Sequence, residues 1–255
     1  METIIHIGQP KTGTSSLQYY LFQHRDELKR QGFFFTDKIL IHRSYNHYLL
    51  NIYALDKNRF SPKKEVMLKA KGKKYLDELN EKLPLEIKNI YNEARQQKCG
   101  KIIWSNEGLY LLNSKKEYEK LINLFKPYSN NILVYCCFRD KLSFKESYLN
   151  QLKRVNISSS NKSDSYRYLK SDSWLFDYDR KKSLLRDVFD ECIFFDYNSK
   201  DNVKPFLELI NIQLNRYAEL RLNKTKNNKI RILSKNFSKI LRHIKWPNNT
   251  LKGII

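Results

Sequence analysis

The amino-acid sequence predicts an α/β fold, a three-layer αβα sandwich around a mainly parallel central sheet. Two observations support this prediction. Short apolar runs alternate along the chain with longer segments of helical periodicity, which is the order that parallel strands and their connecting helices require. The run at residues 132–138, ILVYCCF, is apolar throughout, as expected of a parallel strand that is covered on both faces.

Each predicted element has a local signal. The runs TIIHI and KIIWS are typical of buried strands, and the segment after the first run has apolar residues at helical spacing up to Gly32. Gly72 and Pro84 are expected to interrupt the long helical segment 62–98. The predicted strands are 3–7, 33–36, 101–105, 132–138 and 192–197, and the predicted helices are 14–32, 62–98, 115–126, 143–155, 174–189 and 203–214, with irregular segments at 37–60 and 156–165.

We expect one domain over residues 1–222, because no linker divides the chain. Residues 223–255 are expected to form a basic helical extension. No acidic residue follows Glu219, and apolar residues recur at helical spacing from Ile230 to Ile244. Such a helix can pack on the domain with its basic face in solvent, or it can lie on an anionic membrane surface through residues 224–252.

The chain carries a formal charge of +21, from 48 Lys and Arg against 27 Asp and Glu. This charge favours an anionic partner, such as a phosphate cofactor, an acidic glycan, nucleic acid or a membrane surface. A nucleic-acid partner is not expected, because no reader motif or aromatic stacking platform is evident. No metal site is expected either, because the cysteines include no C-x-x-C pair. Without an evident signal peptide or membrane-spanning run, the expected location is the cytoplasm, with membrane association at its inner surface if the extension binds lipid.

The loop at residues 8–15 is the strongest functional signal. Gly8 and Gly13 have the spacing of an ATP-binding P-loop, G-x-x-x-x-G-K-[ST], and the loop joins a predicted strand to a predicted helix, as in P-loop NTPase-like folds. However, Thr14 stands where the P-loop has its lysine, and the only lysine of the loop is Lys11. Backbone N–H groups at a helix start can surround one anionic group. The loop adds the hydroxyl groups of Thr12, Thr14, Ser15 and Ser16.

A lysine in the middle of the loop suits a donor whose transferred group hangs directly from a 5′-phosphate, because it can neutralise charge on the bridging oxygen. KTGTSSLQ after a strand resembles the 5′-phosphosulfate loop of the P-loop sulfotransferases, which use 3′-phosphoadenosine 5′-phosphosulfate (PAPS). A second family motif is a strand ending in Arg, followed eight residues later by Ser on a helix, and Arg139 and Ser147 resemble it. The resemblance implies that PAPS is bound by Lys11, Thr12, Gly13, Thr14, Ser15 and Ser16 near the sulfate, and by Arg139 and Ser147 at the 3′-phosphate.

Transfer to a hydroxyl needs a base for the hydroxyl proton. Glu107 follows the predicted strand 101–105, at about the place where cytosolic members of the family carry a catalytic histidine. His47 lies in the region where heparan-type members place base and acceptor contacts, and imidazole needs little pKa tuning for this task. His42 is a third candidate. Lys11 is expected to be catalytic as well as cofactor-binding.

The sequence therefore predicts a PAPS-dependent sulfotransferase that acts on a hydroxyl of a saccharide, such as a capsule, a lipopolysaccharide or another glycan. The saccharide preference comes from the resemblance to bacterial-type and heparan-type members and from the basic charge. One alternative is a P-loop small-molecule kinase, which would want lysine at position 14. Others are a basic nucleic-acid-binding protein and a sulfotransferase-like fold that binds its ligand without activity.

Overall fold

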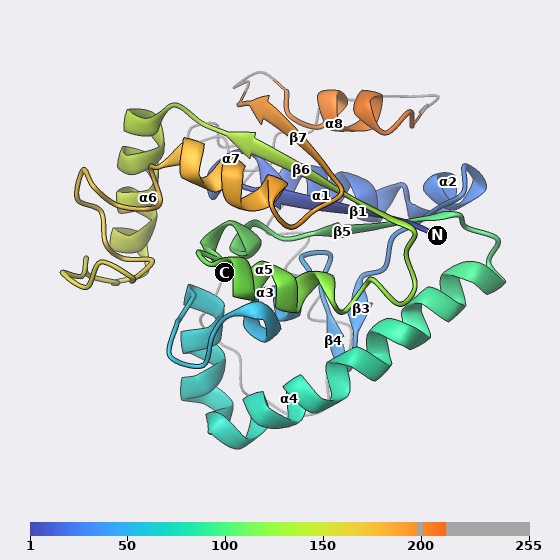
Figure 1. Ribbon diagram of the computed structural model, residues 1–255, viewed down its shortest axis with the longest axis horizontal. Helices are drawn as coiled ribbons and strands as arrows, with labels where there is room; N and C mark the ends of the chain where they lie inside the picture. The colour runs from blue at the N-terminus through green and yellow to red at the C-terminus, as the bar shows by residue number, and fades with distance from the viewer. Residues whose placement is uncertain (198–200, 213–255) are drawn as a thin grey trace, which may run out of the picture. The chain divides into compact units, whose positions relative to one another are not determined.

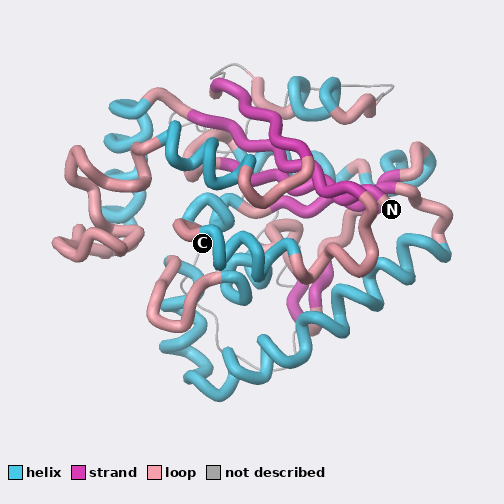
Figure 2. The backbone as a smooth tube through the Cα atoms, viewed as in Figure 1, coloured by secondary structure: helices cyan, strands magenta, loops and turns pink. Residues whose placement is uncertain are grey.

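A computed structural model describes residues 1–197 and 201–212. In this part of the chain five parallel strands form one sheet in the order β2-β5-β1-β6-β7, with helices on both faces (Figures 1 and 2), so the predicted α/β fold is confirmed. A separate two-stranded hairpin pairs β3 with β4. The strands are β1 (Glu2–Gly8), β2 (Phe33–Phe34), β3 (Lys38–Ile39), β4 (His42–Arg43), β5 (Lys101–Ser105), β6 (Asn131–Phe138) and β7 (Glu191–Asp196).

The two faces of the sheet carry different helices. Successive side chains of a strand point to opposite faces, so Ile4 of β1 packs in one apolar cluster, and Ile5 and Ile7 pack in the other. The first cluster is covered by α1 (Thr14–Gln23), α2 (Arg25–Arg30) and α8 (Lys204–Leu209). The second is covered by α3 (Tyr48–Ala54), α4 (Pro62–Gln96), the 3₁₀ helix η1 (Glu107–Leu111), α5 (Lys115–Ile122), α6 (Lys141–Arg154) and α7 (Tyr178–Arg186).

Several predicted helices differ from those observed. The segment 14–32 is two helices, because the backbone at His24 leaves the helical region (φ −102°, ψ 15°). Gly72 does interrupt α4, with φ 77° and ψ 176°, whereas Pro84 lies inside the helix without a break. The segment 174–189 is helical only over α7. The irregular segment 37–60 contains the β3–β4 hairpin and α3, which are too short for a periodic sequence pattern.

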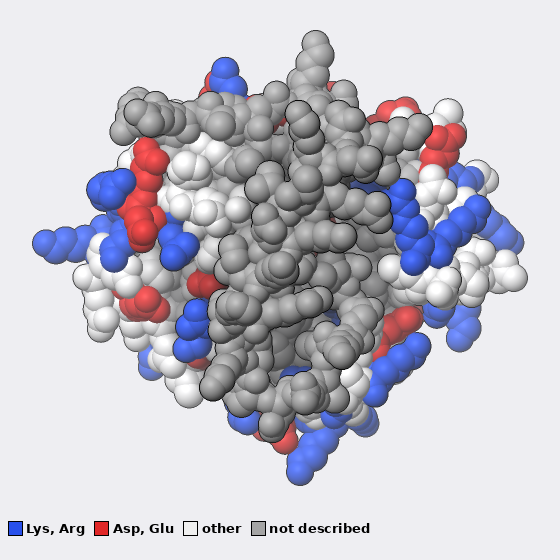
Figure 3. Space-filling model, turned by 180° about the vertical axis from the view of Figure 1, so that it is seen from behind, with Lys and Arg blue, Asp and Glu red and all other residues white. Residues whose placement is uncertain are grey.

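The basic extension predicted for residues 223–255 lies outside the described residues. Within the described part, no helix combines the length and the apolar character needed to cross a membrane. Figure 3 shows Lys and Arg side chains at several places around the described part of one face, with acidic side chains among them. The surplus positive charge seen there does not by itself mark one binding surface.

Candidate active site

The loop between β1 and α1 is shaped by two residues with left-handed backbone. Lys11 has φ 73° and Gly13 has φ 77°, a region that suits glycine and is costly for lysine. Gly13 is the N-cap of α1, and its carbonyl accepts from the N–H groups of Ser16 (2.9 Å) and Leu17 (3.3 Å). A strained non-glycine residue at a loop tip is often part of a functional site, so the conformation of Lys11 fits a ligand-binding role.

The glycine that ends β1 permits the close approach of α1. A Cβ atom added to Gly8 would lie 1.9 Å from Cγ2 of Thr14 and 3.1 Å from Cε1 of His6. No side chain fits there, so the start of the helix packs directly against the strand. The sequence pattern identified this glycine correctly by its spacing from Gly13.

The turn leaves a group of backbone donors free. Among the described residues, the N–H groups of Lys11, Gly13, Thr14 and Ser15 have no hydrogen-bond acceptor. Unpaired N–H groups at a helix start carry partial positive charge and bind anions. The hydroxyl of Thr12 is not available in the same way, because it donates to the carbonyl of Gln9 at 2.7 Å. Thr12 therefore shapes the loop, and its predicted contact with a ligand through the hydroxyl is not supported.

The structure brings the two predicted anion-binding motifs together. Gly8 pairs with Cys137 in the parallel register of β1 and β6, so these strands end side by side. Nη1 of Arg139 donates to the carbonyl oxygen of Lys11 at 3.1 Å. The Arg139 guanidinium also lies 5.1 Å from the ring centre of Tyr197, which is a cation–π distance.

A buried glutamine that the sequence analysis missed holds this arrangement. The side-chain oxygen of Gln9 accepts from the backbone N–H of Arg139 at 2.7 Å. Its side-chain nitrogen donates to the hydroxyls of Tyr178 (2.9 Å) and Tyr110 (3.3 Å). Tyr178 in turn donates to the carbonyl oxygen of Arg139 at 2.7 Å. Both backbone polar groups of Arg139 are therefore fixed to the loop that carries Lys11.

The site has an excess of positive charge. The pKa of Lys11 is lowered by burial and by the charges of Arg154 and Arg139. In the described part of the chain, none of these three cations has a salt bridge to an acidic side chain. Neighbouring like charges are unfavourable unless an anion compensates them, so this cluster is suited to a phosphate or sulfate group.

One face of α6 adds to the cluster. Ser147 is half-buried on this helix, and Arg154 lies seven residues further, two turns along the same face. Along the axis of α6, Ser147 therefore lies between Arg139, which precedes the helix, and Arg154, which ends it. Arg154 is about 10 Å further along the axis than Ser147. Sequence reasoning missed Arg154, although its helical spacing from Ser147 was a usable signal.

Glu107 lies beside the helix that starts at the loop. Its carboxylate accepts from the side-chain amides of Gln18 on α1 (3.0 Å) and Asn46 (2.8 and 2.9 Å). Asn46 also accepts a hydrogen bond from Asn106, so the amide is itself oriented. No salt bridge in the described part of the chain neutralises this carboxylate. Glu107 is thus held in place by neutral donors and not by a cation.

The geometry argues against His47 as the base. Its side chain is 1% exposed, Nε2 lies 2.7 Å from the carbonyl oxygen of Thr36, and Nδ1 accepts from the backbone N–H of Ser105 at 2.9 Å. Both ring nitrogens are committed to backbone groups, and burial lowers the pKa to about 4. His47 therefore ties strand β5 to the segment before α3 and has no free nitrogen for an acceptor.

His42 is also engaged elsewhere. Its ring nitrogens lie within hydrogen-bond distance of the hydroxyls of Tyr75 and Tyr48, on α4 and α3. Burial and then the charge of Lys71 lower its pKa. His42 packs the hairpin against these helices, so of the three base candidates only Glu107 contacts the helix that follows the loop.

His6 in β1 and Ser105 at the end of β5 hold these two strands together next to the site. Nδ1 of His6 lies 2.7 Å from the hydroxyl of Ser105, and both side chains are buried. Burial lowers the pKa of His6 to about 3. This contact joins the end of β1 to the end of β5. Among the described residues, no group of three or more His, Cys, Asp or Glu side chains is placed to hold a metal ion.

Comparisons with known proteins give only distant likenesses. No protein-family model and no curated protein sequence matches the chain. Among solved structures, a sulfotransferase from Alicyclobacillus acidocaldarius is similar over 96% of this chain and 94% of its own, with 14% identity and a TM-score of 0.47. The sulfotransferase domain from the curacin biosynthetic pathway is similar over 84% of this chain and 74% of its own (11% identity, TM-score 0.42).

A putative kinase from Chloroflexus aurantiacus is similar over 84% of this chain and 98% of its own, with 12% identity and a TM-score of 0.39. Identities and TM-scores this low assign neither a family nor an activity to this chain. The functional argument therefore depends on the residues of the site.

Proposed function

We propose that this chain is a PAPS-dependent sulfotransferase that transfers a sulfuryl group to a hydroxyl of a saccharide. The observation that supports this most directly is the hydrogen bond from the Arg139 guanidinium to the carbonyl oxygen of Lys11. This contact supports the proposal that the two predicted anion-binding motifs form one site, at the adjoining ends of β1 and β6. A single ligand with two separate anionic groups can then contact both motifs.

The residues present fit such a ligand. Unpaired N–H groups at the start of α1 suit one anionic group, and the planar guanidinium of Arg139 suits a phosphate, which it can bind with paired hydrogen bonds. Ser147, half-buried on α6, is the residue of the second motif that would add a hydroxyl. PAPS would supply the sulfuryl group on its 5′-phosphate, with adenosine 3′,5′-bisphosphate (PAP) as the leaving group.

Each chain residue then has a defined task. Lys11 neutralises negative charge that develops on the bridging oxygen of the 5′-phosphate, and its lowered pKa reflects burial and two neighbouring cations that an anion would offset. Arg139 and Ser147 hold the 3′-phosphate. Glu107, oriented by the amides of Gln18 and Asn46, takes the proton of the acceptor hydroxyl.

The position of the loop lysine separates this proposal from a kinase. A P-loop kinase uses a lysine next to the second glycine to reach the β- and γ-phosphates of ATP, and Thr14 occupies that position. Lys11 instead sits in the middle of the loop, where its carbonyl contacts Arg139. The saccharide acceptor rests on the family resemblance and on the basic charge of the chain.

The test is calorimetric titration of the protein with PAP, with ATP–Mg²⁺ as the competing ligand. We expect PAP to bind at one site and more tightly than ATP–Mg²⁺. Lys11→Ala should abolish transfer of sulfate from PAPS to saccharide acceptors, measured with labelled donor. Tighter binding of ATP–Mg²⁺ than of PAP would favour the kinase, and PAP binding without any transfer would favour a protein that only binds.

A further inference from the structure

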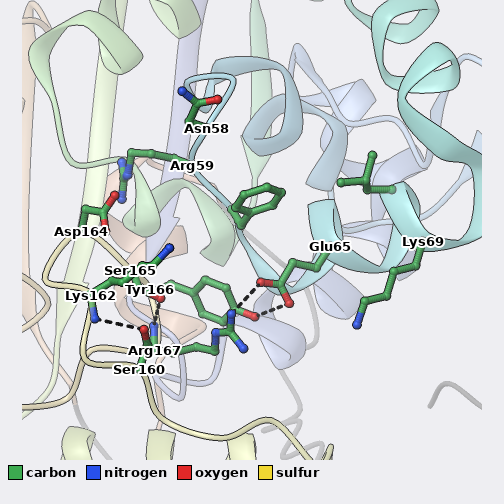
Figure 4. Close-up of a pocket in the computed structure, with 12 residues that line it drawn as sticks. Asn58, Arg59, Glu65, Lys69, Ser160, Lys162, Asp164, Ser165, Tyr166 and Arg167 are labelled. Atoms are coloured by element: carbon green, nitrogen blue, oxygen red, sulfur yellow. Dashed lines mark hydrogen bonds and ion pairs between the residues drawn. The ribbon is translucent and has the colours of Figure 1, made fainter.

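A cavity of about 460 Å³ lies between the first turns of α4 and the loop that follows α6 (Figure 4). Its volume is in the range of small-ligand sites. Glu65 joins the two walls, because its carboxylate accepts from the Tyr166 hydroxyl at 3.0 Å and forms an ion pair with Arg167 at 3.4 Å. The lining residues are Asn58, Arg59, Phe60, Glu65, Leu68, Lys69, Ser160, Lys162, Asp164, Ser165, Tyr166 and Arg167.

The cavity is built on elements that lead away from the proposed active site. The helix α6 begins directly after Arg139, and its following loop forms one wall. On the other wall, Nη2 of Arg59 donates to the carbonyl oxygen of Leu111 at 3.0 Å. Leu111 ends the 3₁₀ helix that starts at Glu107, so this contact lies roughly 8 Å from the proposed base along the helix axis. Figure 1 shows both walls on the side of the molecule toward which β6 points.

Two of the arginines that line the cavity are incompletely paired. The Nε atoms of Arg59 and Arg167 are buried and have no hydrogen-bond partner. Buried donors without an acceptor are unfavourable and rare in proteins.

The charges of the lining point to an anionic ligand. Of the four cationic and two acidic lining residues, Arg59 is paired with Glu117 and Arg167 with Glu65, so Lys69 and Lys162 remain against one acid, Asp164. Lys69 and Lys162 are exposed and have no ion pair among the described residues. The ring of Phe60, 37% exposed, adds an apolar surface on which a sugar ring can pack.

We propose that this cavity binds an acidic saccharide unit of the acceptor, one that carries a carboxylate or a sulfate group. The inference rests on the proposed function, because it assigns the acceptor of the same active site. The acidic unit is held by the cationic lining, and a neighbouring unit of the same chain then presents its hydroxyl to Glu107. The cavity thereby selects acidic over neutral glycans.

The experiment compares tetrasaccharides in the presence of saturating PAP. Hyaluronan, heparin-derived and polygalacturonate tetrasaccharides are the acidic probes, maltotetraose is the neutral probe, and binding is measured by calorimetry. The test variant is Lys69→Gln with Lys162→Gln. The control variant, Lys73→Gln with Lys74→Gln, removes the same charge from exposed positions of α4 that do not line the cavity.

We expect at least one acidic probe to bind more tightly than maltotetraose, and the test variant to weaken that binding about tenfold, as for one lost charged hydrogen bond. The control variant should match the wild type. Equal loss in both variants, or equal binding of acidic and neutral probes, would overturn the inference. Failure of the wild type to bind PAP would instead refute the proposed function, so the two failures are distinguishable.

Discussion

Replacing Arg139 by alanine is the sharpest test of the site, because this side chain connects its two halves. The substitution removes the 3.1 Å hydrogen bond to the carbonyl oxygen of Lys11 and the contact with the ring of Tyr197. The backbone N–H and carbonyl of residue 139, which bind Gln9 and Tyr178, remain in place. The effect should therefore be confined to the missing guanidinium.

The magnitude follows from the bonds that are lost. A hydrogen bond to a charged group contributes roughly 1.5–3 kcal/mol. Loss of the proposed hydrogen bond to the 3′-phosphate should therefore weaken PAP binding by about 10- to 150-fold. Arg139→Lys keeps the charge but not the planar fork, so it should fall between the wild type and the alanine variant. Adenosine 5′-monophosphate lacks the 3′-phosphate, and its affinity should be nearly the same for wild type and Arg139→Ala.

Calorimetry of both nucleotides against both proteins completes a thermodynamic cycle that isolates the contact. If Arg139→Ala weakened the monophosphate as much as PAP, the arginine would act by shaping the loop and not by binding the 3′-phosphate. If PAP affinity did not change at all, Arg139 would lie outside the ligand site and the two-motif proposal would fail.

Three further predictions follow from the same geometry. Glu107→Gln should lower the rate of sulfate transfer about 100-fold or more and leave PAP affinity unchanged; a normal rate would remove Glu107 as the base. Arg154→Ala should weaken PAP binding and raise the pKa of Lys11, since this charge helps to lower it, whereas Lys153→Ala on the same turn should do neither; equal titration results for the two variants would contradict this. The histidines His6 and His47 have folded-state pKa values of about 3 and about 4, below the ordinary 6.5, so the unfolded chain takes up protons first as the pH falls. The contribution of these two histidines to the free energy of unfolding is complete above pH 6.5 and is lost as the pH falls toward 4 and below. At pH 5 the loss is about 2 kcal/mol for each histidine. Urea unfolding at pH 7.5 and pH 5.0 measures it, and an equal free energy of unfolding at both pH values would refute it.

The sequence alone predicted the parallel sheet and the loop between β1 and α1. Strands such as β6 are buried on both faces, so their apolar runs are visible in the sequence. Gly8 and Gly13 were found by their spacing, and the structure gives the reason for each: a close approach of α1 at Gly8 and a left-handed backbone at Gly13. The hairpin and η1 could not be predicted, because the two-residue strands of the hairpin have no apolar run and the five-residue η1 is too short for helical periodicity.

The choice among base candidates needed the structure. His47 and Glu107 are both polar residues near strand ends, and nothing in their neighbours along the chain distinguishes them. Contacts with residues distant in sequence do: the ring nitrogens of His47 bind backbone groups of Thr36 and Ser105, whereas Glu107 faces α1 through Gln18. Gln9 was missed because a lone glutamine in a loop has no motif.

The side chain of Gln9 also bears on how much this protein must rearrange to hold its ligand. Its amide joins the turn that carries Lys11 to the backbone of Arg139 before anything is bound. The conformational entropy lost in bringing the ends of β1 and β6 together is therefore part of the free energy of folding and does not reduce the affinity for a ligand. For the proposed ligand, the distance between its two binding groups would then be set before binding, so that nucleotides with a different separation of charges should bind weakly.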